Sequence, residues 1–132
     1  MATYNDGNAV WRASGVSMGR LTTHILNTAE GCPAAGVGIR LFAVGDERRL
    51  VASTVSNADG RTDAALVEGD AMQSGCYELE FDIGPYFSAR GMATGKPAFL
   101  DTVVIRFSVA AGEHYHVPLL ASPWSYSTYR GS

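Results

Sequence analysis

The sequence predicts an all-β fold, a sandwich of two sheets with seven or eight short strands and one short helix. Short segments alternate apolar and polar residues with the period of two that half-exposed strands show. Fifteen glycines and five prolines divide the 132 residues into short runs, which indicates many tight turns. Charged residues make up only 17% of the chain, fewer than a helical bundle usually carries.

Residues 1–20 differ from the rest of the chain. They are rich in Asn, Gly, Ser and Ala and show no hydrophobic period. We therefore expect a flexible N-terminal arm over residues 1–20 and one folded domain over residues 21–132. A domain of this length buries about two-thirds of its unfolded surface, so it needs no disulfide to fold. Cys32 and Cys76 are accordingly expected to be reduced thiols.

Three strands are predicted in the first half of the domain. Alternating apolar residues define each strand, and turn-forming residues separate them at 30–33 and 45–47. Odd-numbered side chains of the first strand would face the core, which places His24 on the outer face. The predicted strands cover residues 21–27, 37–44 and 49–55.

A strong turn signal follows at Asn57-Ala58-Asp59-Gly60. Asn and Asp side chains bond to the local backbone, and Gly accepts a positive φ. A short strand is expected to begin near Arg61, directly after this turn. A rigidly placed arginine can orient an anionic or carbonyl-rich ligand through its planar guanidinium, although a solvated surface role is the simpler alternative.

The second half of the domain contains the clearest alternation of the chain. In residues 76–83, large apolar side chains alternate with three carboxylates, which indicates a half-exposed antiparallel strand. Gly84-Pro85 is expected to end this strand. The turn at Gly112-Glu113 is expected to pair the strands on its two sides. The remaining predicted elements are one or two helical turns over 86–92 and strands over 102–109, 114–121 and 126–130.

Alternation also sorts the residues of the strand that follows Gly112. If its odd-numbered residues fill the core, then His116, Pro118 and Leu120 point outward. His24 and Leu26 point outward from the first strand in the same way. An outer face with these apolar residues needs a cover, so we expect a second subunit over it. Histidines in such a groove titrate near neutral pH and can exchange protons, although a plain surface or interface role is the alternative.

Composition and motifs disfavour several other functions. A net charge of −3 and a single lysine argue against nucleic-acid binding. No apolar run approaches the about 20 residues that a membrane span requires, so no membrane partner is expected. The sequence has neither a glycine-rich phosphate loop after a strand nor a Gly-x-Ser-x-Gly motif. His114 and His116 share a strand face, but we expect no metal site and no cofactor.

Four segments carry a family resemblance: residues 21–34, 57–62, 81–87 and 114–132. Together, and in this order, they resemble the transthyretin-like family over about residues 20–132. The terminal Tyr129-Arg130-Gly131-Ser132 is typical of the hydrolase branch of the family. The hormone-binding branch differs at the histidines and at this tail.

The resemblance implies an eight-stranded transthyretin-like sandwich that assembles as a homotetramer, a dimer of dimers, with active sites between the dimers. It also implies an activity: hydrolysis of 5-hydroxyisourate to 2-oxo-4-hydroxy-4-carboxy-5-ureidoimidazoline in urate breakdown. Periplasmic members carry a signal sequence that this chain lacks, so a cytoplasmic protein is expected.

Carried over by position, the resemblance also implies the site. His24 and His116 would activate a water, and Arg61 would orient the substrate. The resemblance does not decide which of the two histidines is the general base. Ser132 would complete the catalytic set at the chain end. The residues implied to bind the substrate are Tyr129, Arg130, Gly131, Pro118 and Leu120.

Two other functions stay open. A transthyretin-like protein that binds a small ligand without catalysis would use the same channel, but it would have no reason to keep both histidines, Arg61 and the tail. A sandwich that only mediates protein contacts would be a monomer with a polar outer face. The expected Leu26, Pro118 and Leu120 surface argues against that function.

Overall fold

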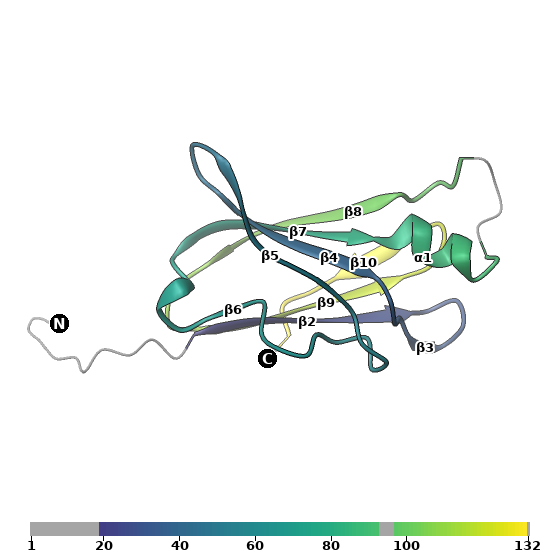
Figure 1. The fold of residues 1–132 in the computed structure, drawn as a ribbon, viewed down its shortest axis with the longest axis horizontal. Helices are drawn as coiled ribbons and strands as arrows, with labels where there is room; N and C mark the ends of the chain where they lie inside the picture. Colours follow the sequence, from purple (N-terminus) through teal and green to yellow (C-terminus); the bar gives the residue numbers. More distant parts are fainter. Residues whose placement is uncertain (1–18, 93–96, 132) are drawn as a thin grey trace, which may run out of the picture.

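The computed structural model describes residues 19–92 and 97–131, which form two sheets in two layers (Figure 1). The predicted two-sheet sandwich with one α-helix is confirmed. Nearly all of the predicted arm at 1–20, and the predicted site residue Ser132, lie outside the described residues. Within the described residues, no helix is long and apolar enough to cross a membrane.

The first sheet carries the candidate site. Its strands are β2 (Arg20–Asn27), β3 (Cys32–Pro33), β6 (Val67–Glu68), β9 (His114–Ala121) and β10 (Tyr126–Thr128). The order is β10-β9-β2-β3, with β6 also paired to β2. The central pair, β2 and β9, is parallel, and every other pair in this sheet is antiparallel.

The second sheet is antiparallel throughout, in the order β5-β4-β7-β8. A 3-10 turn, η1 (Gly69–Ala71), precedes β7, and the helix α1 (Ile83–Ala89) follows it. The strands are β4 (Gly38–Val44), β5 (Arg48–Val55), β7 (Gly75–Asp82) and β8 (Thr102–Val109).

The core lies between the two sheets. Leu21 and Ile25 of β2 and Leu119 of β9 are fully buried against Leu79 and Phe81 of β7. These are the odd-numbered residues of each strand, as the alternation predicts. The even-numbered residues of β2 and β9 therefore face away from the core, which confirms the predicted outer face.

The predicted pairing across the Gly112 turn is wrong. β8 lies beside β7 in the second sheet, whereas β9 lies between β2 and β10 in the first. The turn thus passes from one sheet to the other, and the Ala110 amide donates a hydrogen bond to the Tyr115 hydroxyl across it, at 2.7 Å. Turn-forming residues indicate where the chain reverses. Which strands pair depends on strand edges supplied by segments far away in the sequence.

The prediction of a strand near Arg61 is also wrong. The side-chain oxygen of Asn57 accepts hydrogen bonds from the amides of Asp59 and Arg61, which keeps the chain in a turn. Residues 61–66 form a loop, and the next strand, β6, begins only at Val67.

Several predicted boundaries also differ from the structure. α1 begins at Ile83 and includes Gly84-Pro85, because proline fits the first turn of a helix without losing a hydrogen bond. The turn predicted at 30–33 ends in β3, and β10 stops at Thr128.

The outer face of the second sheet carries an ion-pair network. Arg40 donates two hydrogen bonds to Asp82, at 3.0 and 2.7 Å, and a third to Glu80 at 2.9 Å. Arg48 donates to Glu78 at 2.8 Å and also pairs with Glu80. This face is therefore suited to water, unlike the outer face of the first sheet, which mixes imidazole with apolar side chains.

This network should make stability depend on acid pH. Hydrogen bonds from Arg40 hold the pKa of Asp82 below its ordinary value of 3.8. The folded carboxylate therefore stabilises the protein above about pH 4, and that contribution is lost as the pH falls through the lowered pKa. Asp82→Asn should lower the unfolding free energy by about 0.5–1 kcal/mol at pH 7 and by less near pH 2. Urea unfolding across this range, with Asp46→Asn as the exposed control, measures the difference; an equal loss at both pH values would contradict the assignment.

Candidate active site

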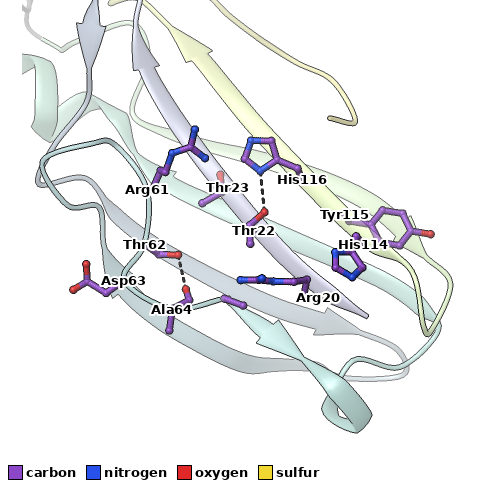
Figure 2. A pocket seen from close by; sticks show the side chains of 11 residues that line it. Arg20, Thr22, Thr23, Arg61, Thr62, Asp63, Ala64, His114, Tyr115 and His116 are labelled. Carbon is purple, nitrogen blue, oxygen red and sulfur yellow. Dashed lines mark hydrogen bonds between the residues drawn. The ribbon is translucent and has the colours of Figure 1, made fainter. Parts of the chain in front are cut away.

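A cleft of about 580 Å³ opens on the outer face of the first sheet (Figure 2). Side chains of β2 and β9 form its floor, and the loop after Gly60 forms one wall. Arg20 and His114, which are register partners, lie at one end, and Arg61 and His116 also line the cleft.

Of the two histidines predicted from the sequence, His116 lines this cleft, whereas His24 lies close to the His116 ring but is not part of the lining. Their ring centroids are 6.5 Å apart and the ring planes are inclined at 40°. The parallel register explains the approach, because it sets Thr22 opposite His116 and His24 opposite Pro118 on the same face. The Thr22 hydroxyl lies 2.9 Å from Nδ1 of His116, at hydrogen-bond distance.

The surroundings of His116 favour its neutral form. Partial burial lowers its pKa from the ordinary value of 6.5, and the nearby charges of Arg61 and His24 lower it further. The ring is therefore uncharged at neutral pH. An uncharged imidazole at the edge of a cleft can accept a proton from a bound water.

Arg61 reaches the cleft because backbone hydrogen bonds hold its loop against β2. The Ile25 amide donates to the Gly60 carbonyl at 2.8 Å, and the Leu66 amide donates to the Leu21 carbonyl at 2.9 Å. Together these bonds hold residues 60–66 along the strand. Figure 2 shows the Arg61 side chain on the same side of the cleft as the His116 ring.

Gly60 allows this close approach. Its φ is +76°, and a Cβ there would overlap the carbonyl oxygen of Ile25. Gly60→Ala should therefore destabilise the fold by about 1–3 kcal/mol and displace Arg61. Gly31→Ala is the matched control, because Gly31 has a φ of +70° but open space around it. Thermal unfolding of the two variants compares them; an equal loss in both would show that the contact with Ile25 is unimportant.

The C-terminal tail continues along β9 past the end of β10. Thr128 pairs with Leu119, and Gly131 pairs with His116 in the same register. The Gly131 amide donates to the His116 carbonyl at 2.7 Å. This register places Gly131 on the outer face beside His116, and Arg130 lies on the inner side with Tyr115 and Val117.

The Arg130 side chain holds the tail rather than lining the cleft. Its guanidinium lies 4.0 Å from the centre of the Tyr115 ring. It also donates to the His114 carbonyl at 3.0 Å and to the Glu113 carboxylate at 3.2 Å. These contacts tie the end of the chain to the start of β9.

Gly131 lies directly against the catalytic candidate. A Cβ at this position would lie 2.8 Å from Cδ2 of the His116 ring, closer than real Cβ contacts. Only glycine therefore lets the tail pass this closely. The ring of His116 is confined by the tail on one side and by Thr22 on another.

The structure thus brings His24, Arg61, His116 and the tail together from four separate segments. Pro118, although on the outer face, is already buried, and Leu120 is half-buried. Neither belongs to the lining of the cleft, and Tyr129 is 60% exposed.

Sequence reasoning placed Thr22 on the outer face but gave it no role. The signal that could have identified it is a hydroxyl two residues from His24 on the same strand face.

Over residues 19–92 and 97–131, no group of three or more His, Cys, Asp or Glu side chains could hold a metal ion.

Comparison with known proteins gives the family. Residues 21–131 match the family model described as HIUase/Transthyretin family. The chain belongs to this family. It is 57% identical to a 5-hydroxyisourate hydrolase of Ralstonia nicotianae over 117 residues, which cover 87% of this chain and 100% of that protein.

Several solved structures resemble the HIUase/transthyretin fold of this chain, among them a 5-hydroxyisourate hydrolase of Klebsiella pneumoniae, with a TM-score of 0.74 and 34% identity, covering 87% of this chain and 100% of that one. Two others are of different kinds. One is an (S)-allantoin synthase, with a TM-score of 0.84 and 43% identity; the match covers 88% of this chain but only 44% of the synthase. The other is sea bream transthyretin in complex with thyroxine, with a TM-score of 0.76 and 27% identity, covering 85% of this chain and 94% of that one.

Proposed function

We propose that the chain hydrolyses 5-hydroxyisourate at its N1–C6 amide-like bond and releases 2-oxo-4-hydroxy-4-carboxy-5-ureidoimidazoline in urate breakdown. One observation carries the proposal: His116 and Arg61 line one cleft, and the His24 ring lies with its centroid 6.5 Å from that of His116, in a chain 57% identical to a 5-hydroxyisourate hydrolase. The substrate is a small, polar, carbonyl-rich ring, which suits a cleft with several hydrogen-bond donors.

In the proposed reaction, His116 takes a proton from the attacking water. Its ring is neutral at pH 7 and faces the cleft. Such a general base contributes about 10²–10⁴-fold to the rate. His24, whose ring centroid is 6.5 Å from that of His116, holds the water on its other side.

Arg61 then stabilises the charge that develops at C6. Among the described residues, no carboxylate forms an ion pair with its guanidinium, so the planar set of donors is open to the substrate. Donors positioned in advance for an oxyanion contribute about 10²–10³-fold to the rate. The same fork can hold the imide edge of the ring.

The tail completes the proposed site. Gly131 lies on the outer face beside His116, and we propose that Tyr129 and the hydroxyl of Ser132 contact the substrate next to it. The contacts of Arg130 with Tyr115 support a role in anchoring this tail. Through the tail, Arg130 would then contribute to substrate binding.

A homotetramer, a dimer of dimers, is part of the proposal. Leu26 and Leu120 are register partners and only half-buried on the outer face, beside Pro118. A neighbouring subunit would cover these side chains and enclose the substrate. Light scattering at micromolar concentration tests this assembly.

The cytoplasmic location expected from the sequence stays a prediction. Cys32 and Cys76 are free thiols in the structure, as expected from the sequence.

The competing function is that of a carrier that binds a small ligand without catalysis; sea bream transthyretin, which shares the fold, is solved in complex with thyroxine. A multiple-turnover assay separates the two. With freshly made 5-hydroxyisourate in hundredfold excess over protein, a hydrolase should remove all of the substrate absorbance faster than a protein-free blank. A carrier would remove at most one equivalent, and that outcome would refute the proposal.

The activity should also depend on pH in a defined direction. A protonated His116 cannot accept a proton, so kcat/KM should fall as the pH falls through its pKa. Because that pKa lies below 6.5, the acid midpoint should lie below 6.5 as well. Initial rates between pH 4.5 and 8, corrected for spontaneous decay, measure it; a midpoint above 7 would contradict the role of His116.

A further inference from the structure

We propose that Thr22 is a positioning residue for this reaction. Its hydroxyl accepts a hydrogen bond from Nδ1–H of His116, so that Nε2, which faces the cleft, is unprotonated. Its catalytic meaning rests on the proposed function. The tautomer of the His116 ring, which the inference also states, can be tested without any substrate.

The contact comes from the sheet itself. Thr22 and His116 are register partners across the parallel β2–β9 pair, although 94 residues separate them in sequence. The hydroxyl oxygen and Nδ1 are 2.9 Å apart in a partly buried position. A neutral imidazole has one donor and one acceptor nitrogen, so the bond made by Nδ1 decides the state of Nε2.

The charges around the ring decide the direction of this bond. Arg61 acts on His116 from the loop as a positive charge, and the His24 ring on β2 lies with its centroid 6.5 Å from that of His116. A positive charge repels an N–H that points toward it and favours a lone pair there. Since Nδ1 is occupied by Thr22, the nitrogen turned to the cleft is Nε2, and it carries the lone pair.

The ring has little freedom to turn away. The backbone of Gly131 passes so close that a Cβ there would lie 2.8 Å from Cδ2 of His116. Thr22 on one side and the tail on the other therefore hold the imidazole in one orientation. Among the described residues, His24 has no hydrogen-bond partner of this kind, which favours His116 as the general base.

Two substitutions test the role in catalysis. Thr22→Val keeps the shape but removes the hydroxyl, and Thr22→Ser keeps the hydroxyl. We expect kcat to fall about tenfold in Thr22→Val with little change in KM, the effect of one lost hydrogen bond. Thr22→Ser should stay near the wild-type rate. Thr54→Val on β5, in the other sheet, is the matched control and should keep full activity.

Nitrogen NMR of His116 in the substrate-free protein tests the ring state directly. Near pH 7.5 we expect a protonated signal at Nδ1 and an unprotonated signal at Nε2, with the opposite tautomer growing in Thr22→Val. The opposite tautomer in the wild-type protein, or an unchanged tautomer in Thr22→Val, would overturn the inference. So would a Thr22→Ser variant as slow as Thr22→Val. If the protein fails to hydrolyse 5-hydroxyisourate, the proposed function falls but the NMR result still decides the role of Thr22.

Discussion

Replacing His116 with alanine should lower kcat for 5-hydroxyisourate by at least about a hundredfold, the lower range of a general-base contribution. The side chain is half-buried, faces the cleft and contacts Thr22, so its removal takes the proposed base away from the cleft. Initial rates of substrate decay at equal protein concentration measure the effect. The fold should persist, because the side chain lies on the outer face and not in the core.

His114→Ala provides the comparison for this experiment. His114 lies on the same strand face but is exposed at the far end of the cleft and lacks the contact with Thr22. Its loss should therefore be much smaller than that of His116→Ala. If His116→Ala works at nearly the wild-type rate, the assignment of the base is wrong, and His24 becomes the residue to test.

Gly131→Ala should be the second severe variant, although the change adds only one methyl group. The new Cβ would lie 2.8 Å from Cδ2 of His116, so either the imidazole or the tail must move. A displacement of about 1 Å at a catalytic group can cost about a hundredfold in rate. We expect a loss of this order in kcat with little change in melting temperature, because the tail lies at the edge of the sheet.

Gly45→Ala is the matched control for this substitution. Gly45 lies in a hairpin turn, where an added Cβ meets nothing within 4 Å. Activity assays and thermal unfolding of both variants compare the two positions. A Gly131→Ala enzyme with normal kcat would show that the tail tolerates a side chain at this point and does not confine the ring.

Much of the fold could be predicted from local residue patterns. The period of two in residues 21–27 and 114–121 gave both the strands and their faces, because burial against one core selects alternate residues. The pairing across Gly112 could not be predicted in this way. Turn chemistry is local, whereas the parallel pairing of β2 with β9 joins segments more than 90 residues apart.

The candidate site was predicted unevenly for the same reason. Alternation placed His24 and His116 on outer faces, and the family resemblance identified Arg61 and the tail. The contact of Thr22 with His116 depends on the register of β2 against β9, which the sequence does not contain in any local pattern. The inward direction of Arg130 likewise follows from the register of the tail.

The most direct test of the hydrolase proposal follows one atom of the substrate. 5-Hydroxyisourate labelled with ¹³C at C6 is mixed with a catalytic amount of protein, and carbon NMR spectra are recorded against a protein-free blank. We predict that the C6 signal is replaced by a carboxylate signal faster than in the blank, over many turnovers. A C6 signal that persists as long as in the blank would contradict the proposed function.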